Sequence, residues 1–207
     1  MEDFDRWVSD QLDPVRDQPI ANRLMYLASA LGDDGRLWLG LAAGQLFSPG
    51  RRRRGLDQAL WIGIESAIVN GPMKFGTKRS RPAPRATHAH HFRPPGGSSF
   101  PSGHAASAFT MATMLAEGGG VRLLWFVPAG IVASSRVHVG VHHPTDVIAG
   151  AIVGIGFGLA GRRLHLVDRL VNKAIELAPG EQLRRVIERV LPPSPTGAEH
   201  SSPPPGT

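Results

Sequence analysis

Five apolar stretches, separated by polar loops rich in glycine, proline and arginine, constrain the fold of this 207-residue chain more than any other feature. They predict an all-α protein, a helical bundle of about five apolar helices with amphipathic helices at its ends. The stretches cover residues 37–47, 56–73, 101–116, 121–134 and 147–161. A membrane-crossing helix needs about 20 apolar residues, and the longest run free of Asp, Glu, Lys, Arg and His, residues 147–161, has 15. Length alone therefore leaves a soluble bundle with buried helices open.

The fifth stretch favours a bundle embedded in a membrane. It carries Gly150, Gly154 and Gly158 at four-residue spacing, and such a face of small residues lets helices approach closely in lipid. The mean hydropathy of the chain, −0.10, is low for a protein with several spans, but the polar ends and the loop 74–100 lower that average. We therefore predict a membrane-embedded bundle, in which the glycine face could also join two chains.

The chain divides into four predicted parts. Residues 1–35 have apolar residues at helical spacing and two proline interruptions, which predicts an amphipathic segment at the membrane interface. Residues 36–166 form the predicted membrane-embedded bundle. Residues 167–191 predict an amphipathic helix broken at a Pro-Gly pair, and the proline- and serine-rich tail 192–207 predicts disorder.

Composition excludes several classes of function. The chain has no cysteine, which excludes disulfides, thiolate catalysis and zinc–cysteine sites. Its net charge of +6 suits an anionic membrane surface or a phosphorylated substrate, whereas its single tyrosine and the absence of a recognisable module argue against nucleic acid. The acidic start lacks the basic and apolar regions of a secretory signal, so internal segments are expected to enter the membrane.

Counting the membrane crossings brings three polar elements to one face of the bundle. If the run Arg51–Arg54 is cytoplasmic, as the positive-inside rule favours, the second stretch ends on the far side just before Lys74. The third stretch starts on that side and the fourth returns to it. The elements 74–82, 101–104 and 135–146 then meet opposite the arginine anchors, which predicts one site built from all three.

The cations and the helix start in these elements suit a phosphoryl group. Such a group spreads negative charge over three oxygens during transfer, and Lys74, Arg81 and Arg136 would supply three positive charges. The planar guanidinium of arginine can bind two oxygens at once. Ser102 and Gly103 open a helix, where backbone N–H groups point at an anion and glycine permits a close approach.

Two histidines would complete the chemistry. One must attack phosphorus as a neutral imidazole, with a carboxylate on its other nitrogen. His142 and Asp146, four residues apart where the fifth helix starts, fit this pairing, and Pro144 suits the first turn of that helix. The other histidine must protonate the departing oxygen, and His104, beside the phosphate cradle, fits this task.

The three elements together resemble the signature motifs of the type 2 phosphatidic acid phosphatase superfamily, which also contains vanadate-dependent haloperoxidases. The resemblance covers residues 37–163 and rests on eleven residues in order: Lys74, Arg81, Pro82, Pro101, Ser102, Gly103, His104, Ser135, Arg136, His142 and Asp146. It implies an all-helical bundle, an active site at the outer face of the membrane, and no metal ion or other cofactor.

The resemblance also implies a role for each polar residue of the motifs. His142 would be the nucleophile that forms a phosphohistidine, Asp146 would assist it, and His104 would be the general acid. The phosphate group would be bound by Lys74, Arg81, Ser102, Gly103 and Arg136.

Polar residues outside the motifs have plainer interpretations. A histidine cluster in the long loop could bind a metal, but a solvated loop is favoured because no cysteine or carboxylate accompanies it: His88, His90 and His91. Cations of the same region could meet an anionic headgroup or be solvated: Lys78, Arg79, Arg85 and Arg93. Glu65 and Asn70 are expected to face the interior of the bundle in a structural role, since contact with lipid would be costly.

The sequence thus predicts a metal-independent lipid phosphatase, an integral protein of a bacterial inner membrane with its active site facing outward. Its predicted substrate is a membrane lipid: a polyprenyl pyrophosphate, a polyprenyl-phosphosugar phosphate, phosphatidic acid or phosphatidylglycerophosphate. The short chain resembles the small bacterial members that serve cell-envelope carriers, which favours a polyprenyl lipid. The alternatives are a soluble acid phosphatase or haloperoxidase relative, and a non-catalytic lipid-binding scaffold.

Overall fold

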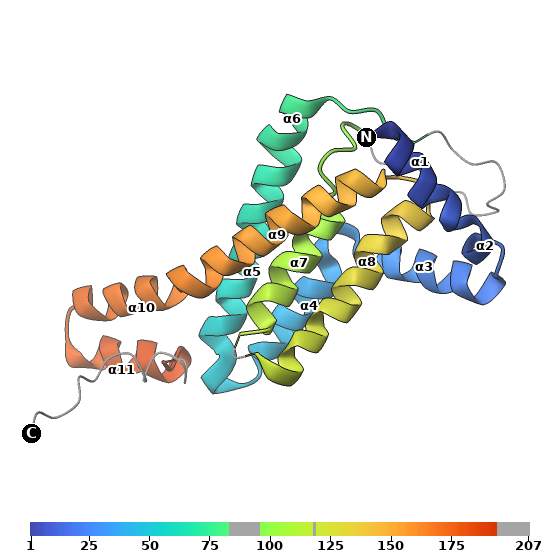
Figure 1. Cartoon of the computed structure of the whole chain (residues 1–207). Helices are drawn as coiled ribbons and strands as arrows, with labels where there is room; N and C mark the ends of the chain where they lie inside the picture. Colours follow the sequence, from blue (N-terminus) through green and yellow to red (C-terminus); the bar gives the residue numbers. More distant parts are fainter. Residues whose placement is uncertain (83–95, 118, 194–207) are drawn as a thin grey trace, which may run out of the picture.

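The computed structural model describes residues 1–82, 96–117 and 119–193, and these residues form helices joined by turns and loops (Figure 1). The N-terminal part contains α1 (Glu2–Gln11), α2 (Asp13–Arg16), α3 (Pro19–Leu31) and the short turn η1 (Asp33–Gly35). The bundle contains α4 (Arg36–Gln45), η2 (Pro49–Arg51), α5 (Arg52–Ile68), η3 (Val69–Met73), α6 (Lys74–Thr77), α7 (Gly103–Leu115), η4 (Gly120–Trp125), α8 (Phe126–His138) and α9 (Pro144–Leu164). The C-terminal part contains α10 (Leu166–Leu177) and α11 (Glu181–Val190).

The prediction of an all-α fold is confirmed across the described ranges, and each predicted apolar stretch coincides with a helix of the bundle. Pro144 occupies the first turn of α9, as predicted, and this helix has 21 residues. A helix of that length spans about 31 Å, close to the thickness of the hydrocarbon core of a bilayer. Among the residues described, one helical stretch, Pro144–Leu177, is long and apolar enough to cross a membrane.

The helix that precedes the long loop is longer than predicted. Gly71 has non-helical backbone angles and Pro72 lies inside η3, so the regular hydrogen bonding of α5 is interrupted there. The chain nevertheless continues as α6, which begins at Lys74. Lys74 therefore lies on a helix rather than in the predicted loop.

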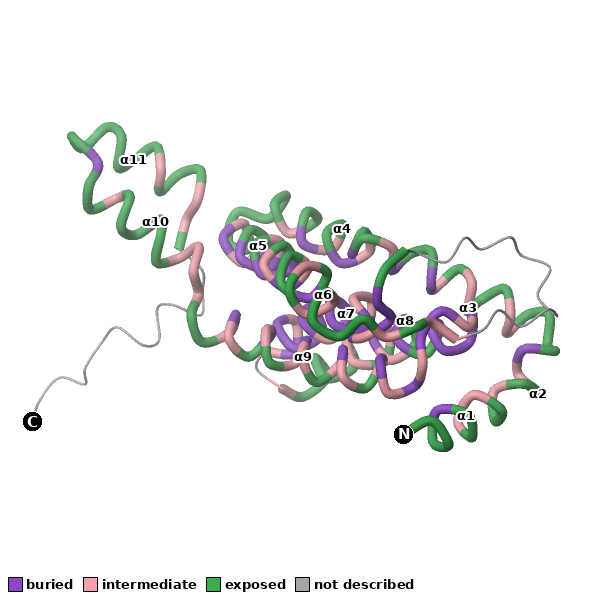
Figure 2. The backbone as a smooth tube through the Cα atoms, turned by 90° about the horizontal axis from the view of Figure 1, so that it is seen from above, coloured by how far each residue is buried: buried purple, intermediate pink, exposed green. Residues whose placement is uncertain are grey.

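Helix α7 lies in the middle of the bundle, in contact with α4, α5, α8 and α9. Most of its side chains are small and buried, so neighbouring helices surround it. The core beside it includes Trp38, Ile62, Met111 and Val132. Figure 2 shows buried residues gathered along these helices, whereas α10 and α11 project from them and are mostly exposed. The position of α7 matters because its N-terminus carries Ser102, Gly103 and His104.

The glycine face of α9 packs against α7 of the same chain. A Cβ atom on Gly154 would overlap the carbonyl oxygen of Ala106, and Gly150 and Gly158 meet α7 with similar closeness. The Thr110 hydroxyl donates to the carbonyl oxygen of Gly154 at 3.1 Å. The predicted close packing is thus realised within one chain. Because α7 covers these glycines, a contact between two chains would have to use another surface.

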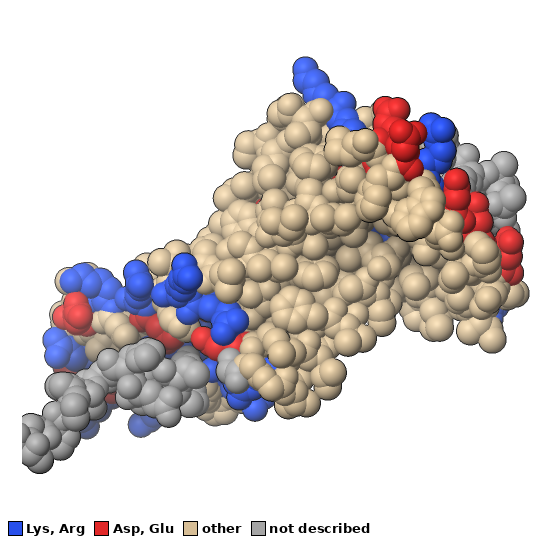
Figure 3. Space-filling model, viewed as in Figure 1, with Lys and Arg blue, Asp and Glu red and all other residues tan. Residues whose placement is uncertain are grey.

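The outer surface of the bundle is apolar in its middle and charged at its two ends. Large apolar side chains such as Leu60, Ile131, Ile148 and Ile152 are exposed on its flanks. Figure 3 shows a broad band without Lys, Arg, Asp or Glu between charged groups at opposite ends of the visible face. An exposed apolar band of this kind suits contact with lipid, where charged side chains are costly.

The N-terminal helices are fastened to the end of the bundle that carries the polar elements. The buried side chain of Arg16 donates to the carbonyl oxygens of His138 at 2.9 Å and Val137 at 2.8 Å. These carbonyls lie at the C-terminal end of α8, where the carbonyl oxygen of Val137 also accepts from the backbone N–H of Gly140 at 3.1 Å. Residues 1–35 therefore contact the segment that leads from α8 into the turn before α9.

Candidate active site

Figure 1 places α6, the N-termini of α7 and α9 and the C-terminus of α8 at one end of the bundle, away from the start of α5, where the run Arg51–Arg54 lies. A pocket of about 260 Å³ opens there. It is lined by Gly32, Asp33, Asp34, Gly35, Ile62, Glu65, Ser66, Asn70, Lys74, Arg81, Gly103, His104, Ser107, Arg136 and His142. The structure thus brings together side chains from all three polar elements, as counting the crossings predicted.

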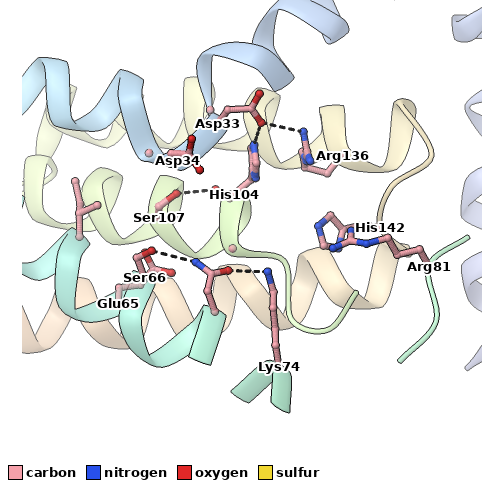
Figure 4. A pocket seen from close by; sticks show the side chains of 15 residues that line it. Asp33, Asp34, Glu65, Ser66, Lys74, Arg81, His104, Ser107, Arg136 and His142 are labelled. Carbon is pink, nitrogen blue, oxygen red and sulfur yellow. Dashed lines mark hydrogen bonds and ion pairs between the residues drawn. The ribbon is translucent and has the colours of Figure 1, made fainter. Parts of the chain in front are cut away.

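Three cations line this pocket, and each is held by neighbouring acceptors (Figure 4). Lys74 Nζ donates to Asn70 Oδ1 at 2.6 Å. Arg81 Nη1 donates to the carbonyl oxygen of Val141 at 2.8 Å. Arg136 is fully buried, and its Nη1 donates to the Ser29 hydroxyl. Three fixed positive charges around one pocket make it a site for an anion.

The N-terminus of α7 faces the same pocket. Ser102 is the N-cap residue, and its hydroxyl accepts a hydrogen bond from the backbone N–H of Ala105. Ser102 is buried below the helix start and does not line the pocket, whereas Gly103 does. A Cβ atom on Gly103 would approach Asn70 Oδ1 to 3.0 Å, so glycine keeps this wall open. Free backbone N–H groups at a helix start favour a bound anion.

His142 reaches the pocket from the turn between α8 and α9, with Asp146 behind it. The Nδ1 atom of His142 lies 3.7 Å from Asp146 Oδ2, which is longer than a hydrogen bond. Both residues are buried. The carboxylate therefore lies on the Nδ1 side of the ring, and Nε2 is the nitrogen left to react with a bound group.

The environment of His142 keeps its imidazole neutral. Burial lowers the pKa of His142 to about 4, and the positive charges of Arg136 and Arg81 act in the same direction, against the opposing effect of Asp146. At neutral pH the ring therefore has a free lone pair on one nitrogen. A nucleophilic imidazole needs this state.

Asp146 has two partners that the sequence analysis missed. Its Oδ1 accepts a hydrogen bond from Arg79 Nη1 at 2.6 Å, and its Oδ2 accepts one from the backbone N–H of His143 at 2.8 Å. Arg79 Nη2 in turn donates to Asp5 Oδ2 at 2.6 Å, and the buried Asp5 also accepts from the backbone N–H of Thr145. Arg79, expected to meet a headgroup or solvent, instead links α1 to the carboxylate beside His142.

His104 also has a partner that the sequence analysis missed. Its Nε2 atom lies 2.8 Å from Oδ1 of Asp33, and Asp33 precedes His104 by 71 residues in the chain. The same carboxylate oxygen is 3.8 Å from Arg136 Nη1. The sequence predicts a turn at Gly32–Gly35. The two adjacent carboxylates of this turn, directly before an apolar stretch, are the sequence signal that could have identified Asp33 as a residue of the site. Asp33 can orient the His104 ring and stabilise its protonated form.

The remaining predicted polar residues are distributed as follows. Lys78 is exposed. Glu65 lines the pocket from α5 and is buried inside the bundle, as expected, whereas Asn70 lines the pocket from η3 but is exposed, contrary to the expectation. The predictions that concern the loop cations and the histidine cluster lie outside the described residues: Arg85, Arg93, His88, His90 and His91. The described arrangement can therefore bind an anion between three cations and a helix start, and can offer it two histidines.

Comparisons with known proteins agree with this geometry. Residues 55–169 match the family model of the PAP2 superfamily. The chain is 36% identical over 128 residues to a decaprenylphosphoryl-5-phosphoribose phosphatase of Mycolicibacterium smegmatis, covering 59% of this chain and 67% of that protein. It is 34% identical over 137 residues to an undecaprenyl-diphosphatase of Sulfolobus acidocaldarius, covering 64% of this chain and 65% of that protein. It thus spans about two thirds of the length of both relatives.

A solved structure has the same fold. It is the crystal structure of a transmembrane PAP2 type phosphatidylglycerolphosphate phosphatase from Bacillus subtilis, which superposes with a TM-score of 0.60 and 25% sequence identity. The match covers 78% of this chain and 84% of that chain. The helices that form the pocket are thus arranged as in a known membrane phosphatase.

Proposed function

This chain belongs to the PAP2 superfamily, and we propose that it is a membrane lipid phosphatase that transfers the phosphoryl group of its substrate to His142 and then to water. Its named relatives are phosphatases of lipid phosphates, which supports this activity. The observation that carries the proposal is the placement of a neutral, buried His142 and of His104 in one pocket with three cations.

The first chemical step breaks the bond between phosphorus and the oxygen of the substrate. Nε2 of His142 attacks phosphorus, and Asp146 stabilises the positive charge that develops on the ring. Lys74, Arg81 and Arg136, together with the backbone at Gly103, hold the phosphoryl oxygens. His104, in the protonated form that its contact with Asp33 favours, donates its proton to the departing oxygen.

The second step returns His142 to its starting state. His104, now neutral, accepts a proton from a water molecule, whose oxygen attacks the phosphorus of the phosphohistidine. The bond between phosphorus and nitrogen breaks, inorganic phosphate leaves, and His104 is again protonated. Each proton and each bond is thereby accounted for without any group beyond the side chains of the pocket.

The position of the pocket supports a lipid headgroup as the substrate. The pocket lies at one end of the apolar band, where a headgroup would stand at the edge of the hydrocarbon. Clusters of arginine, at 51–54 and 162–163, occupy the opposite end of the bundle. By the positive-inside rule, this arrangement supports the proposal that the arginines lie in the cytoplasm and the pocket at the outer face of a bacterial inner membrane.

Phosphate release without a metal ion is the experimental test of this function. The detergent-purified protein is expected to release phosphate from at least one lipid phosphate at the same rate with excess EDTA as with added Mg²⁺. The reason is that the three cations meet the charge that a metal would otherwise neutralise. Release that depends on a divalent metal, or no release from any lipid phosphate, would contradict the proposal.

A further inference from the structure

The pocket has an acidic half of which the proposed phosphoryl transfer uses only Asp33, the partner of His104. In Figure 4, the cationic side of the pocket holds Arg81 and Arg136 with His142, and the opposite side holds Asp34 and Glu65 with Ser66 and Ser107. Lys74 and the pair of Asp33 and His104 lie between these sides, and Asp33 belongs to the acidic half by its charge. Carboxylates do not bind a phosphoryl group, because like charges repel. They accept hydrogen bonds from hydroxyl groups. The acidic half therefore suits a different part of the substrate.

Among the residues of this half, Glu65 gives the strongest evidence for contact with a substrate. Its side chain is 1% exposed, and neither carboxylate oxygen has a hydrogen-bond partner among the described residues. A buried carboxylate without such partners destabilises the folded protein. Attraction to Lys74 offsets part of this cost but leaves the acceptor sites empty. Glu65 lines the pocket, so a bound substrate can fill those sites.

The turn before α4 brings two further carboxylates to the same half. A Cβ atom on Gly32 would come within 2.9 Å of the His104 ring, so the glycine is what lets this turn lie against His104. The close approach places Asp33 on His104 Nε2 and Asp34 at the pocket wall. Asp34 is paired with the exposed Arg36 at 2.9 Å. The turn thus adds acceptors beside those of Glu65.

The position of His104 tells which part of the substrate meets the acidic half. His104 lies between the cations and the carboxylates in Figure 4. In the proposed mechanism its proton goes to the oxygen that leaves phosphorus. The group attached to that oxygen must therefore extend from His104 into the half that holds Asp33, Asp34 and Glu65.

We propose that this acidic half is a subsite for hydroxyl groups, and that the substrate carries a polyol, a sugar or glycerol, directly next to the phosphate that is removed. The inference rests on the proposed function and names its substrate class. Hydroxyls of the polyol donate hydrogen bonds to Glu65 and the neighbouring carboxylates. A diphosphate is disfavoured, because its departing phosphate would meet the carboxylates of Asp33 and Asp34.

Two matched pairs of lipids test the subsite. Phosphatidylglycerophosphate is compared with phosphatidic acid of the same acyl chains, and a polyprenyl-phosphosugar phosphate is compared with a polyprenyl diphosphate of the same prenyl chain. The member with hydroxyls is expected to have a kcat/KM about tenfold or more above that of its partner, because unfilled buried acceptors penalise the other. The two pairs also distinguish a glycerol from a sugar.

Substitution of Glu65 makes the test specific. Glu65→Met fits the space and removes both acceptors, so the preference for the hydroxylated member is expected to fall about tenfold or more. Glu65→Gln keeps one acceptor oxygen and should lower the preference for the hydroxylated lipid less than Glu65→Met does. Thermal unfolding of Glu65→Met should occur at or above the temperature of the native protein, since the substitution removes two buried polar atoms that have no hydrogen-bond partner among the described residues. Glu188→Met, on the exposed surface of α11, is the control and should keep the native preference.

The outcomes separate this inference from the proposed function. Equal use of both members of each pair, or faster release from the diphosphate, would overturn the subsite. An equal loss on all four lipids in Glu65→Met would also overturn it, and would assign Glu65 to balancing the charge of Lys74. No release from any lipid by the native protein would instead contradict the phosphatase itself.

Discussion

Replacing His142 by alanine is expected to lower the rate of phosphate release by about a thousandfold or more. The substitution removes the nitrogen that attacks phosphorus, and the loss of a covalent nucleophile is among the largest single effects in enzymes. Substrate binding should change far less, since Lys74, Arg81 and Arg136 hold the phosphoryl oxygens from other elements. The measurement is kcat for a lipid phosphate by the purified protein in detergent, with binding followed separately by product inhibition.

The neighbouring histidine provides the matched control. His143 follows His142 directly but is the N-cap residue of α9, and its ring contacts the carbonyl oxygen of Ser80 at 3.3 Å. His143→Ala is therefore expected to lower the rate less than about tenfold. A similar loss in both variants would mean that the turn, rather than the nucleophile, had been damaged, and a rate near that of the native protein in His142→Ala would refute the assignment.

The second large effect concerns the packing of α7 against α9. Gly154→Ala places a Cβ atom against the carbonyl oxygen of Ala106, where no flexible side chain can move aside. The two helices must separate, at a cost of about 2 kcal/mol or more in the free energy of unfolding. Activity should fall as well, because α7 carries His104 and α9 carries Asp146. The measurement is the thermal unfolding temperature in detergent, with phosphate release in parallel.

Gly156, on the opposite face of α9 from Gly154, provides the control that shows whether the loss of stability comes from the contact between α7 and α9. A Cβ atom on Gly156 meets nothing within 4 Å, so Gly156→Ala should leave the unfolding temperature equal or slightly higher, by the gain in helix propensity. Equal effects of the two substitutions would show that close packing between α7 and α9 does not hold the bundle together.

Much of the site follows from the sequence because its residues lie in short motifs at helix ends. The spacing of His142 and Asp146, and the start of a helix at Ser102 and Gly103, are local features that fix which side chains share a turn. The convergence of the motifs follows from the order of the apolar stretches, because alternate crossings return the chain to the same face. These inferences need no knowledge of how the helices pack.

The acidic partners of the site follow from packing and were therefore missed. Asp33 meets His104 only because Gly32 allows the turn before α4 to lie against α7. Asp5 meets Arg79 only because α1 folds back onto the start of α9. Neither contact has a fixed spacing in the sequence. The unfilled acceptors of Glu65 are likewise visible only once its surroundings are known.

The central claim is that phosphate passes through a covalent bond to His142, and trapping that bond tests it most directly. The protein is mixed rapidly with a lipid labelled in the phosphoryl group, quenched in alkaline denaturant, and digested for mass spectrometry. We predict a phosphoryl group on the peptide containing His142, labile to acid, formed faster than free phosphate appears and absent from His142→Ala. Rapid phosphate release without any phosphorylated His142, or with the label on another residue, would contradict the account.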